Sequence, residues 1–276
     1  MTLLKETTAN EMAFLKMGFL GFNGSGKTYT AVQVALGLHK YIKSSKPVAF
    51  IDTETGSDWA KPLFAAAGIK LLVAKTRAFK DWIDIIKEAV EAVDIIVADS
   101  VTHPWLELVE AYKTAHNLRG KIPWYHWGPI KTDWAQFSEL YVASPLHFIV
   151  CGRAGWTYDE EKDEEGKKEL IKTGTRMKTE GEFGFEPSLL VEMERTRELD
   201  ESGDKPTGHV GARIVHTSHV LKDRNMGAGN LDGQSFENPT FESFLPHIQA
   251  INIGGVHHAL DIGRSSAEAL RDPQQG

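Results

Sequence analysis

The sequence predicts an α/β fold in which a mostly parallel central sheet is flanked by helices. Short apolar runs, typical of buried strands, alternate along the chain with segments whose apolar residues recur at helical spacing. A glycine-rich segment separates the first apolar run from the first helical segment. Over 276 residues, 41% hydrophobic and 25% charged residues suit a large globular domain. We therefore expect one domain over residues 1–250 and a helical or flexible tail over residues 251–276, with right-handed crossovers between parallel strands.

In the first half of the chain, the apolar runs are short and continuous, as in strands buried on both faces of a parallel sheet. We expect these strands at residues 14–21, 47–51, 69–74 and 94–98. Between them, apolar residues return every three or four positions, which predicts amphipathic helices that pack on the sheet. The expected helices span residues 27–41, 58–67 and 79–93.

The second half mixes helices, aromatic residues and glycine-rich connections. A helix is expected at 102–116, then an aromatic loop at 123–128, then a helix opened by Pro129, because proline is favoured in the first turn. A buried strand at 145–151 follows, and residues 156–178 alternate irregularly around a charged turn, which predicts a long hairpin or a mobile loop. We expect two further strands that pair antiparallel at one sheet edge, and then a loop; these segments are 188–193, 209–221 and 225–239.

Residues 21–28 read Gly-Phe-Asn-Gly-Ser-Gly-Lys-Thr, between an expected strand and an expected helix. A polyphosphate needs many donors in a small volume, and glycines let successive backbone N–H groups point inward while the following helix presents its positive end. In this pattern Lys27 reaches the β- and γ-phosphates and the Thr28 hydroxyl holds Mg²⁺. The pattern predicts ATP and Mg²⁺ as cofactors, bound by Gly21, Asn23, Gly24, Ser25, Gly26, Lys27, Thr28 and Tyr29.

Such a site needs two acidic groups. Asp99 ends the apolar run 94–98 and is expected to hold Mg²⁺ from a neighbouring strand, at the sheet edge where ligands bind in α/β folds. The general base must come from elsewhere, because the position after Asp99 is Ser100. Glu54 lies just past the strand 47–51, which could neighbour the phosphate-loop strand. Asp52 is the rival candidate, although a residue at the strand end can instead orient the loop.

These motifs resemble the core of the RecA recombinase family over residues 14–225. The run Val48-Ala49-Phe50-Ile51-Asp52-Thr53-Glu54 resembles the segment with the family's catalytic glutamate, and Asp94-Ile95-Ile96-Val97-Ala98-Asp99-Ser100-Val101 resembles its magnesium strand. The resemblance implies a RecA-like P-loop NTPase fold, with Glu54 as the catalytic base and Asp99 as the magnesium partner.

A second segment, Lys222-Asp223-Arg224-Asn225, is similar to the Lys-x-Arg motif of DnaB-type helicases and the RadA recombination ATPase. This similarity implies that Lys222 and Arg224 reach the γ-phosphate of a neighbouring subunit; a surface charge cluster is the alternative. The whole chain most resembles small phage-encoded RecA-like ATPases, some proposed to act in single-strand annealing and recombination. RecA relatives place a glutamine after the strand equivalent to 148–151, whereas this chain has Gly152-Arg153, which leaves Arg153 as the candidate phosphate sensor.

In a RecA core, DNA-binding loops follow the magnesium strand and the next strand, which here correspond to residues 101–128 and 154–182. Basic groups interleaved with aromatic rings can neutralise phosphates and stack on bases. The alternative for the aromatic residues is a packed cap on the domain or a subunit interface. The candidates for contact with single-stranded DNA are Arg119, Lys121, Trp124, Tyr125, Trp127, Arg176 and Lys178.

The functional prediction is a homo-oligomeric ATPase, as a hexameric ring or a filament, that acts in DNA recombination, single-strand annealing or replication and is phage-encoded. The net charge of −7 argues against bulk attraction to nucleic acid and favours an alternative, a nucleotide-gated assembly or signalling ATPase without DNA contact. A helicase-like motor or loader is a further alternative. No stretch is apolar enough to span a membrane, and the single cysteine, Cys151, favours a cytoplasmic location, that of the host for a phage protein. Isolated histidines such as His103 are expected to be structural or at the surface.

Overall fold

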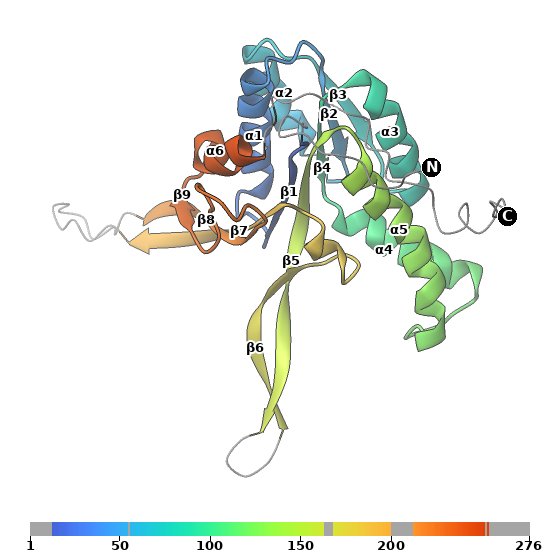
Figure 1. The fold of residues 1–276 in the computed structure, drawn as a ribbon. Helices are drawn as coiled ribbons and strands as arrows, with labels where there is room; N and C mark the ends of the chain where they lie inside the picture. Colours follow the sequence, from blue (N-terminus) through green and yellow to red (C-terminus); the bar gives the residue numbers. More distant parts are fainter. Residues whose placement is uncertain (1–12, 55, 163–167, 200–211, 252, 254–276) are drawn as a thin grey trace, which may run out of the picture.

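The computed structural model describes residues 13–54, 56–162, 168–199, 212–251 and 253, and within them the chain forms one mixed sheet covered by helices (Figure 1). Nine strands belong to the sheet in these described residues. The strands are β1 Lys16–Gly21, β2 Val48–Asp52, β3 Leu71–Lys75, β4 Ile95–Asp99, β5 His147–Lys162, β6 Lys168–Met177, β7 Leu189–Leu199, β8 Ala212–Asp223 and β9 Ser235–Glu237.

The helices form a layer on each face of the sheet (Figure 1). They are α1 Lys27–Tyr41, α2 Ser57–Ala66, α3 Phe79–Ala92, α4 Thr102–Ala115, α5 Trp127–Ala143 and α6 Phe241–Ala250, with short 3-10 turns at Trp124–His126 and Phe183–Phe185. Side chains from α1, α2 and α6 pack in one apolar core, and side chains from α3, α4 and α5 pack in the other. Neighbouring residues of one strand divide between the two cores, as Phe19 and Leu20 do, because successive side chains of a strand point to opposite faces.

The strand order is β3-β2-β4-β5-β1-β7-β8-β9, and β6 pairs with β5 outside this order. The strands from β3 to β7 in this order run parallel, whereas β8 pairs antiparallel with β7, and β9 pairs antiparallel with β8. The predicted fold class, a mostly parallel α/β sheet with antiparallel strands at an edge, is therefore confirmed.

The sequence prediction was wrong about which strands are neighbours. The strand of Glu54 could have been a neighbour of the phosphate-loop strand, but β4 and β5 separate β2 from β1. The magnesium strand β4 is likewise one strand away from β1, because β5 lies between them. Burial explains the order: Phe148–Cys151 of β5 is buried on both faces, which suits a central strand, whereas β3 is only partly buried and forms the edge.

The second half also differs from the prediction in its details. The antiparallel pair β7–β8 forms as expected, but β7 lies inside the sheet because it pairs in parallel with β1. The expected loop 225–239 contains the short edge strand β9. The helix α6 follows it, and the sequence analysis did not predict this helix. The expected aromatic loop 123–128 is partly helical, since α5 already begins at Trp127.

Residues 156–178 form a hairpin, one of the two forms expected. Its first strand is a direct continuation of the buried run 147–151, so β5 leaves the sheet without a break and pairs with β6 beyond it (Figure 1). The expected tail 251–276 lies almost entirely outside the described residues. In the part of the chain that is described, no helix is both long enough and apolar enough to cross a membrane.

Candidate active site

The glycine loop joins β1 to α1 and lines a cavity of about 630 Å³ at the carboxyl edge of the parallel strands. Gly24 and Gly26 have φ values of +73° and +92°, which L side chains rarely adopt, so the loop conformation requires glycine at both positions. A side chain at Gly21 would clash with the Met193 carbonyl oxygen and the Ser25 hydroxyl. At its three glycines the loop therefore lines the cavity with backbone alone.

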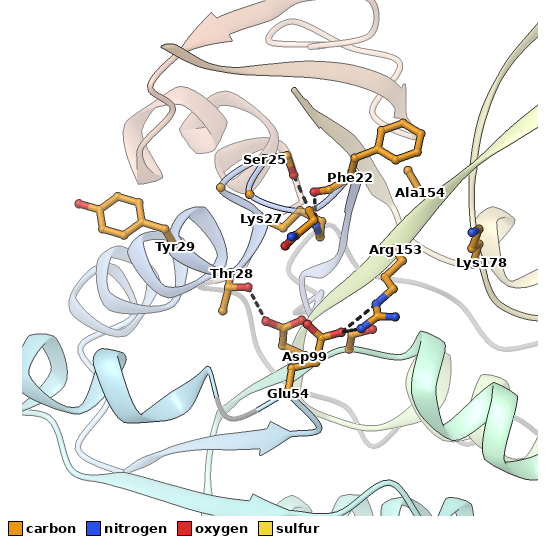
Figure 2. A pocket seen from close by; sticks show the side chains of 15 residues that line it. Phe22, Ser25, Lys27, Thr28, Tyr29, Glu54, Asp99, Arg153, Ala154 and Lys178 are labelled. Carbon is orange, nitrogen blue, oxygen red and sulfur yellow. Dashed lines mark hydrogen bonds and ion pairs between the residues drawn. The ribbon is translucent and has the colours of Figure 1, made fainter. Parts of the chain in front are cut away.

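Lys27 lies at the start of α1 and points into this cavity (Figure 2). Its ammonium group donates a hydrogen bond of 2.9 Å to the Phe22 carbonyl oxygen and lies 3.4 Å from the Ser25 hydroxyl. Burial lowers the pKa of Lys27, and the nearby Asp99 and Glu54 carboxylates oppose this shift. Both contacts are with the loop itself, so the ammonium group can exchange them for hydrogen bonds to an anion that enters the cavity.

Thr28 and Asp99 come from different elements and meet side by side at the cavity (Figure 2). The Thr28 hydroxyl donates to Oδ2 of Asp99, which brings the start of α1 into contact with the end of β4. Burial raises the pKa of Asp99 to about 6, in spite of the hydrogen bond from Thr28. A hydroxyl and a buried carboxylate are hard oxygen donors of the kind that Mg²⁺ prefers, so these two side chains fit the predicted metal.

The rival candidate Asp52 is occupied by the backbone of the following loop. Its Oδ1 accepts from the N–H groups of Glu54 and Gly56 at 2.9 and 3.1 Å. Its Oδ2 accepts from the backbone N–H and the hydroxyl of Ser57 at 2.9 and 2.6 Å. Burial alone would raise the pKa of Asp52, but these hydrogen bonds outweigh it and lower the pKa. Asp52 therefore orients the loop that carries Glu54 and does not itself line the cavity.

Glu54 lines the cavity and contacts two basic side chains. Its Oε1 lies 2.9 Å from Nε and 2.7 Å from Nη2 of Arg153, and 3.4 Å from Nε2 of His103. Arg153 comes from β5, opposite Gly21 of β1, so it reaches the cavity from the strand between the phosphate loop and Asp99. Figure 2 shows the Arg153 guanidinium and the Glu54 carboxylate facing each other below Lys27.

Tyr29 points away from these groups and toward a second cleft of about 320 Å³ (Figure 2). This cleft shares Gly26 and Tyr29 with the first cavity and continues along α1 to the segment after β9. Tyr29 stacks on Trp59 with ring centroids 6.0 Å apart, and both rings are exposed. The other side chains of the cleft are polar or small: Thr30, Gln33, His216, Asn238, Pro239 and Thr240.

His216 is a site residue that the sequence analysis missed. Its Nδ1 lies 3.1 Å from the Ser25 carbonyl oxygen, and its ring packs directly against Gly26. Lys178 also lines the phosphate-loop cavity, next to Arg153, although we expected it to contact DNA. No local signal marks His216, because its contact with the loop depends on the pairing of β7 with β1 and of β8 with β7.

Lys222 and Arg224 lie away from the cavity. Lys222 lies in the last part of β8 and Arg224 directly follows this strand, whose end pairs with the beginning of β7, so both lie at the amino edge of the parallel strands. Lys222 donates a 2.8 Å hydrogen bond to the Phe185 carbonyl oxygen, and Arg224 donates to the same oxygen. Burial lowers the pKa of Lys222 to about 8, and Arg224 contributes to this shift. The two cations are thus held side by side, at the edge of the sheet opposite to the phosphate loop of their own chain.

The DNA-binding candidates divide between two projections that extend beyond the carboxyl edge of the sheet (Figure 1). Between α4 and α5, Trp124 is 85% exposed and Tyr125 is 62% exposed, whereas Trp127 stacks on Trp105 at the margin of the core. Arg119 and Lys121 are exposed beside them. Arg176 lies on β6 of the hairpin. The aromatic group is therefore split, with Trp127 packed and the two preceding rings exposed.

A family model described as an AAA domain matches residues 13–224, which include the glycine loop, Glu54, Asp99 and Arg153. A search of curated proteins found no match.

Proposed function

This chain belongs to the AAA domain family, and from this premise we propose that it binds ATP with Mg²⁺ and hydrolyses the ATP. The observation that carries the proposal is the meeting of four side chains in one cavity beside the glycine loop: Lys27, Thr28, Glu54 and Asp99. Lys27 and Thr28 come from α1, Glu54 from the loop after β2, and Asp99 from the end of β4. Such a set combines an anion cradle, oxygen donors for a metal and a carboxylate that can accept a proton.

In the proposed reaction, the loop N–H groups and Lys27 receive the phosphates. Thr28 and Asp99 would hold Mg²⁺, which when bound offsets the negative charge of the phosphates. Glu54 accepts a proton from the attacking water through its carboxylate. Arg153, which contacts Glu54 from β5, is close enough to the loop to exchange this contact for the terminal phosphate. Asp99 and Glu54 are the two carboxylates that the proposed reaction uses, and it needs no third one from the described residues.

We assign the base and the ribose of the nucleotide to the cleft beside Tyr29. It joins the phosphate-loop cavity at Gly26, and its lining of amide and hydroxyl side chains offers both donors and acceptors to a nucleoside. We assign the aromatic pair Tyr29–Trp59 to the rim of this cleft.

Assembly into a homo-oligomer is the second part of the proposal. Lys222 and Arg224 lie at the opposite edge of the sheet from the cavity of their own chain, whereas they could reach the cavity of a neighbouring subunit. Their joint contact with Phe185 supports a role as a unit, since one carbonyl oxygen holds both cations. A cation supplied by a neighbour would stabilise the transition-state charge and make hydrolysis depend on assembly.

The third part is an action on DNA in recombination, single-strand annealing or replication. The exposed Trp124 and Tyr125 support it, because exposed aromatic rings beside Arg119 and Lys121 can stack on bases of single-stranded DNA. The net charge of −7 favours the second candidate, an assembly or signalling ATPase that makes no DNA contact.

Nucleotide binding is tested by calorimetry with ATP and ADP in the presence and absence of Mg²⁺. We expect Lys27→Ala to weaken binding by roughly 10- to 100-fold, since a charge-assisted hydrogen bond contributes about 1.5–3 kcal/mol. Lys61→Ala is the matched control, because Lys61 pairs with Asp58 on the surface of α2 and lies outside the cavity. Failure of the wild-type chain to bind either nucleotide would overturn the proposal.

The DNA part is tested separately by measuring ATP hydrolysis and gel shifts with single-stranded DNA at low salt. Stimulation of hydrolysis that is lost in Trp124→Ala, with unchanged nucleotide affinity, supports DNA contact. An absence of both stimulation and gel shift would favour the second candidate function, and displacement of a paired strand would favour a helicase-like motor.

A further inference from the structure

His103 is buried between the candidate base and the end of β4, which agrees with the structural one of its two expected places. It belongs to the first turn of α4, and its side chain is only 9% exposed. Its Nδ1 is 2.6 Å from the Thr53 hydroxyl and its Nε2 is 3.4 Å from Oε1 of Glu54. The imidazole thus has one nitrogen toward the interior and one toward the carboxylate.

The direction of the hydrogen bond between Thr53 and His103 follows from what each of the two groups can donate and accept. The backbone N–H of Ser100 donates to the Thr53 hydroxyl oxygen at 2.8 Å, so this oxygen is an acceptor there. The single hydroxyl proton has two possible acceptors, His103 Nδ1 at 2.6 Å and the Ser100 carbonyl oxygen at 3.4 Å. We assign the proton to the shorter contact, so that Thr53 donates to Nδ1.

An imidazole that accepts at Nδ1 is neutral and carries its proton at Nε2. The Nε2–H group then faces Oε1 of Glu54. Burial, the largest influence on His103, lowers its pKa and agrees with a neutral ring. The charged groups around the ring are Glu54 and Arg153 at the cavity, Arg77, which donates to the Thr53 carbonyl oxygen, and Glu107 on α4 itself.

We propose that His103 is a positioning residue for Glu54: Thr53 fixes the imidazole as the Nε2–H tautomer, and this N–H holds the carboxylate at the cavity. The proposal rests on the proposed role of Glu54 as general base. Glu54 needs such a partner because Arg153, which also contacts its carboxylate, lines the cavity and can move to a phosphate. His103 is anchored through Thr53 to the backbone beside Asp99 and so stays in place when Arg153 moves.

The tautomer is measured by NMR on the full chain labelled with ¹⁵N and ¹³C, with the ring of His103 assigned through its backbone. We expect a neutral ring protonated at Nε2 near pH 7, and a changed Nε2–H signal in Glu54→Gln. A ring protonated at Nδ1, or an Nε2–H signal that Glu54→Gln leaves unchanged, would overturn the proposal. This experiment does not depend on ATP hydrolysis.

The kinetic test compares His103→Leu, which has no donor, with His103→Gln, whose side-chain amide can still donate. We expect His103→Leu to lower kcat by roughly 10- to 100-fold, as for a displaced base, with KM and the Kd for ADP within about twofold. His103→Gln should recover a large part of kcat. A kcat within twofold of wild type in His103→Leu, or an equal loss in both variants together with weakened ADP binding, would overturn the positioning role.

The two experiments separate this inference from the function on which it rests. If the wild-type chain binds nucleotide but does not hydrolyse it, the proposed ATPase activity fails, and the tautomer measurement still decides whether His103 holds Glu54.

Discussion

Arg153 is the residue at which the cavity, the candidate base and the hairpin strand meet. Its guanidinium contacts Glu54 at 2.7 Å, and its own strand continues into the hairpin. If ATP binds as proposed, a cation at this place would distinguish a nucleotide with a terminal phosphate from one without it, because only the former offers a replacement for the Glu54 contact.

We therefore predict that Arg153→Ala weakens binding of a non-hydrolysable ATP analogue more than binding of ADP. The expected difference is roughly 10-fold, the effect of one charge-assisted hydrogen bond. Calorimetry with both nucleotides measures it, and Arg213→Ala is the control because Arg213 is an exposed residue of β8 that pairs with Glu237. Equal weakening of both nucleotides would contradict the sensor role.

His147 provides a prediction about stability. Its Nδ1 accepts a 3.0 Å hydrogen bond from the Leu15 N–H, and burial, aided by the nearby Lys16, lowers the pKa of His147 from 6.5 to about 4. Because the unfolded chain binds this proton more tightly, the stability contribution is present above pH 6.5 and is lost as the pH falls toward 4. The loss amounts to about 3 kcal/mol near pH 4.

The contribution is isolated by comparing urea unfolding of the wild type with that of His147→Asn between pH 7 and pH 4.5. An asparagine oxygen can still accept from Leu15, but it does not titrate, so the variant should lose less stability on acidification. The comparison removes the opposite effect of Asp99, whose raised pKa favours the folded chain as it gains a proton. Parallel pH profiles for the two proteins would refute the prediction.

At this scale, sequence reasoning works where the chemistry is contained in a short segment. The glycine loop could be identified because donors, lysine and hydroxyl lie within eight consecutive residues. Asp99 and Glu54 follow from their places after apolar strands, and both line the cavity. His103 and His216 could not be identified, because their partners Glu54 and Ser25 are brought to them by tertiary contacts.

At the scale of the elements, the start of α2 depends on Asp52. This carboxylate accepts hydrogen bonds from three backbone N–H groups and a hydroxyl at the beginning of the helix. The same contacts fix the loop that places Glu54 in the cavity. The capping of α2 and the position of the candidate base are therefore linked.

We predict that Asp52→Ala lowers the free energy of unfolding by about 1–3 kcal/mol, the cost of unsatisfied donors and a lost cap. It should also lower kcat, while ADP affinity stays close to wild type because the glycine loop is untouched. Urea unfolding and ATPase assays measure both effects. Ser57→Ala removes one of the hydrogen bonds and should show a smaller loss; an equal or larger loss in Ser57→Ala would contradict the assignment.

The elements themselves were predicted well wherever the periodicity is strong. The alternation of β1 to β4 with α1 to α3 could be read from apolar spacing alone. Strand order could not, because spacing says nothing about neighbours: β5 enters between β4 and β1 although it follows them in the chain. The strand β9 has three residues, too few for a pattern, and α6 contains Pro246, which weakens the helical signal.

For the whole molecule, the central question is whether sites are shared between subunits. Lys222 and Arg224 lie at the sheet edge opposite to their own glycine loop. A chain that needs these cations for hydrolysis must therefore receive them from another copy.

We predict that Arg224→Ala binds nucleotide normally but loses turnover, and that mixing it with the inactive Lys27→Ala restores activity. In a randomly mixed oligomer, about a quarter of the interfaces combine an intact Lys27 with an intact Arg224, so about a quarter of the wild-type rate is expected. The ATPase rate is followed as a function of mixing ratio. A mixture no more active than its two components, or wild-type turnover in Arg224→Ala alone, would contradict sharing.

The layered α/β architecture was predictable because it follows from composition and alternation, whereas assembly and DNA contact were not. These depend on surfaces such as the exposed pair Trp124 and Tyr125, and exposure itself is fixed only after the fold is complete. Trp127, three residues later than Trp124, has the same residue type and yet packs on Trp105.

The uninterrupted course of β5 has a geometric consequence. The strand is paired with β4 up to Cys151 and with β1 up to Arg153, and it then extends for nine residues to Lys162, where it pairs with β6 alone. At about 3.3 Å per residue, this arm is about 30 Å long. A tilt of about 5° at its base, produced by a sub-ångström displacement beside the phosphate loop, sweeps its far end through about 3 Å. If nucleotide binding displaces Arg153 as proposed, the hairpin would act as a lever with its base at the cavity and would magnify that displacement at its far end.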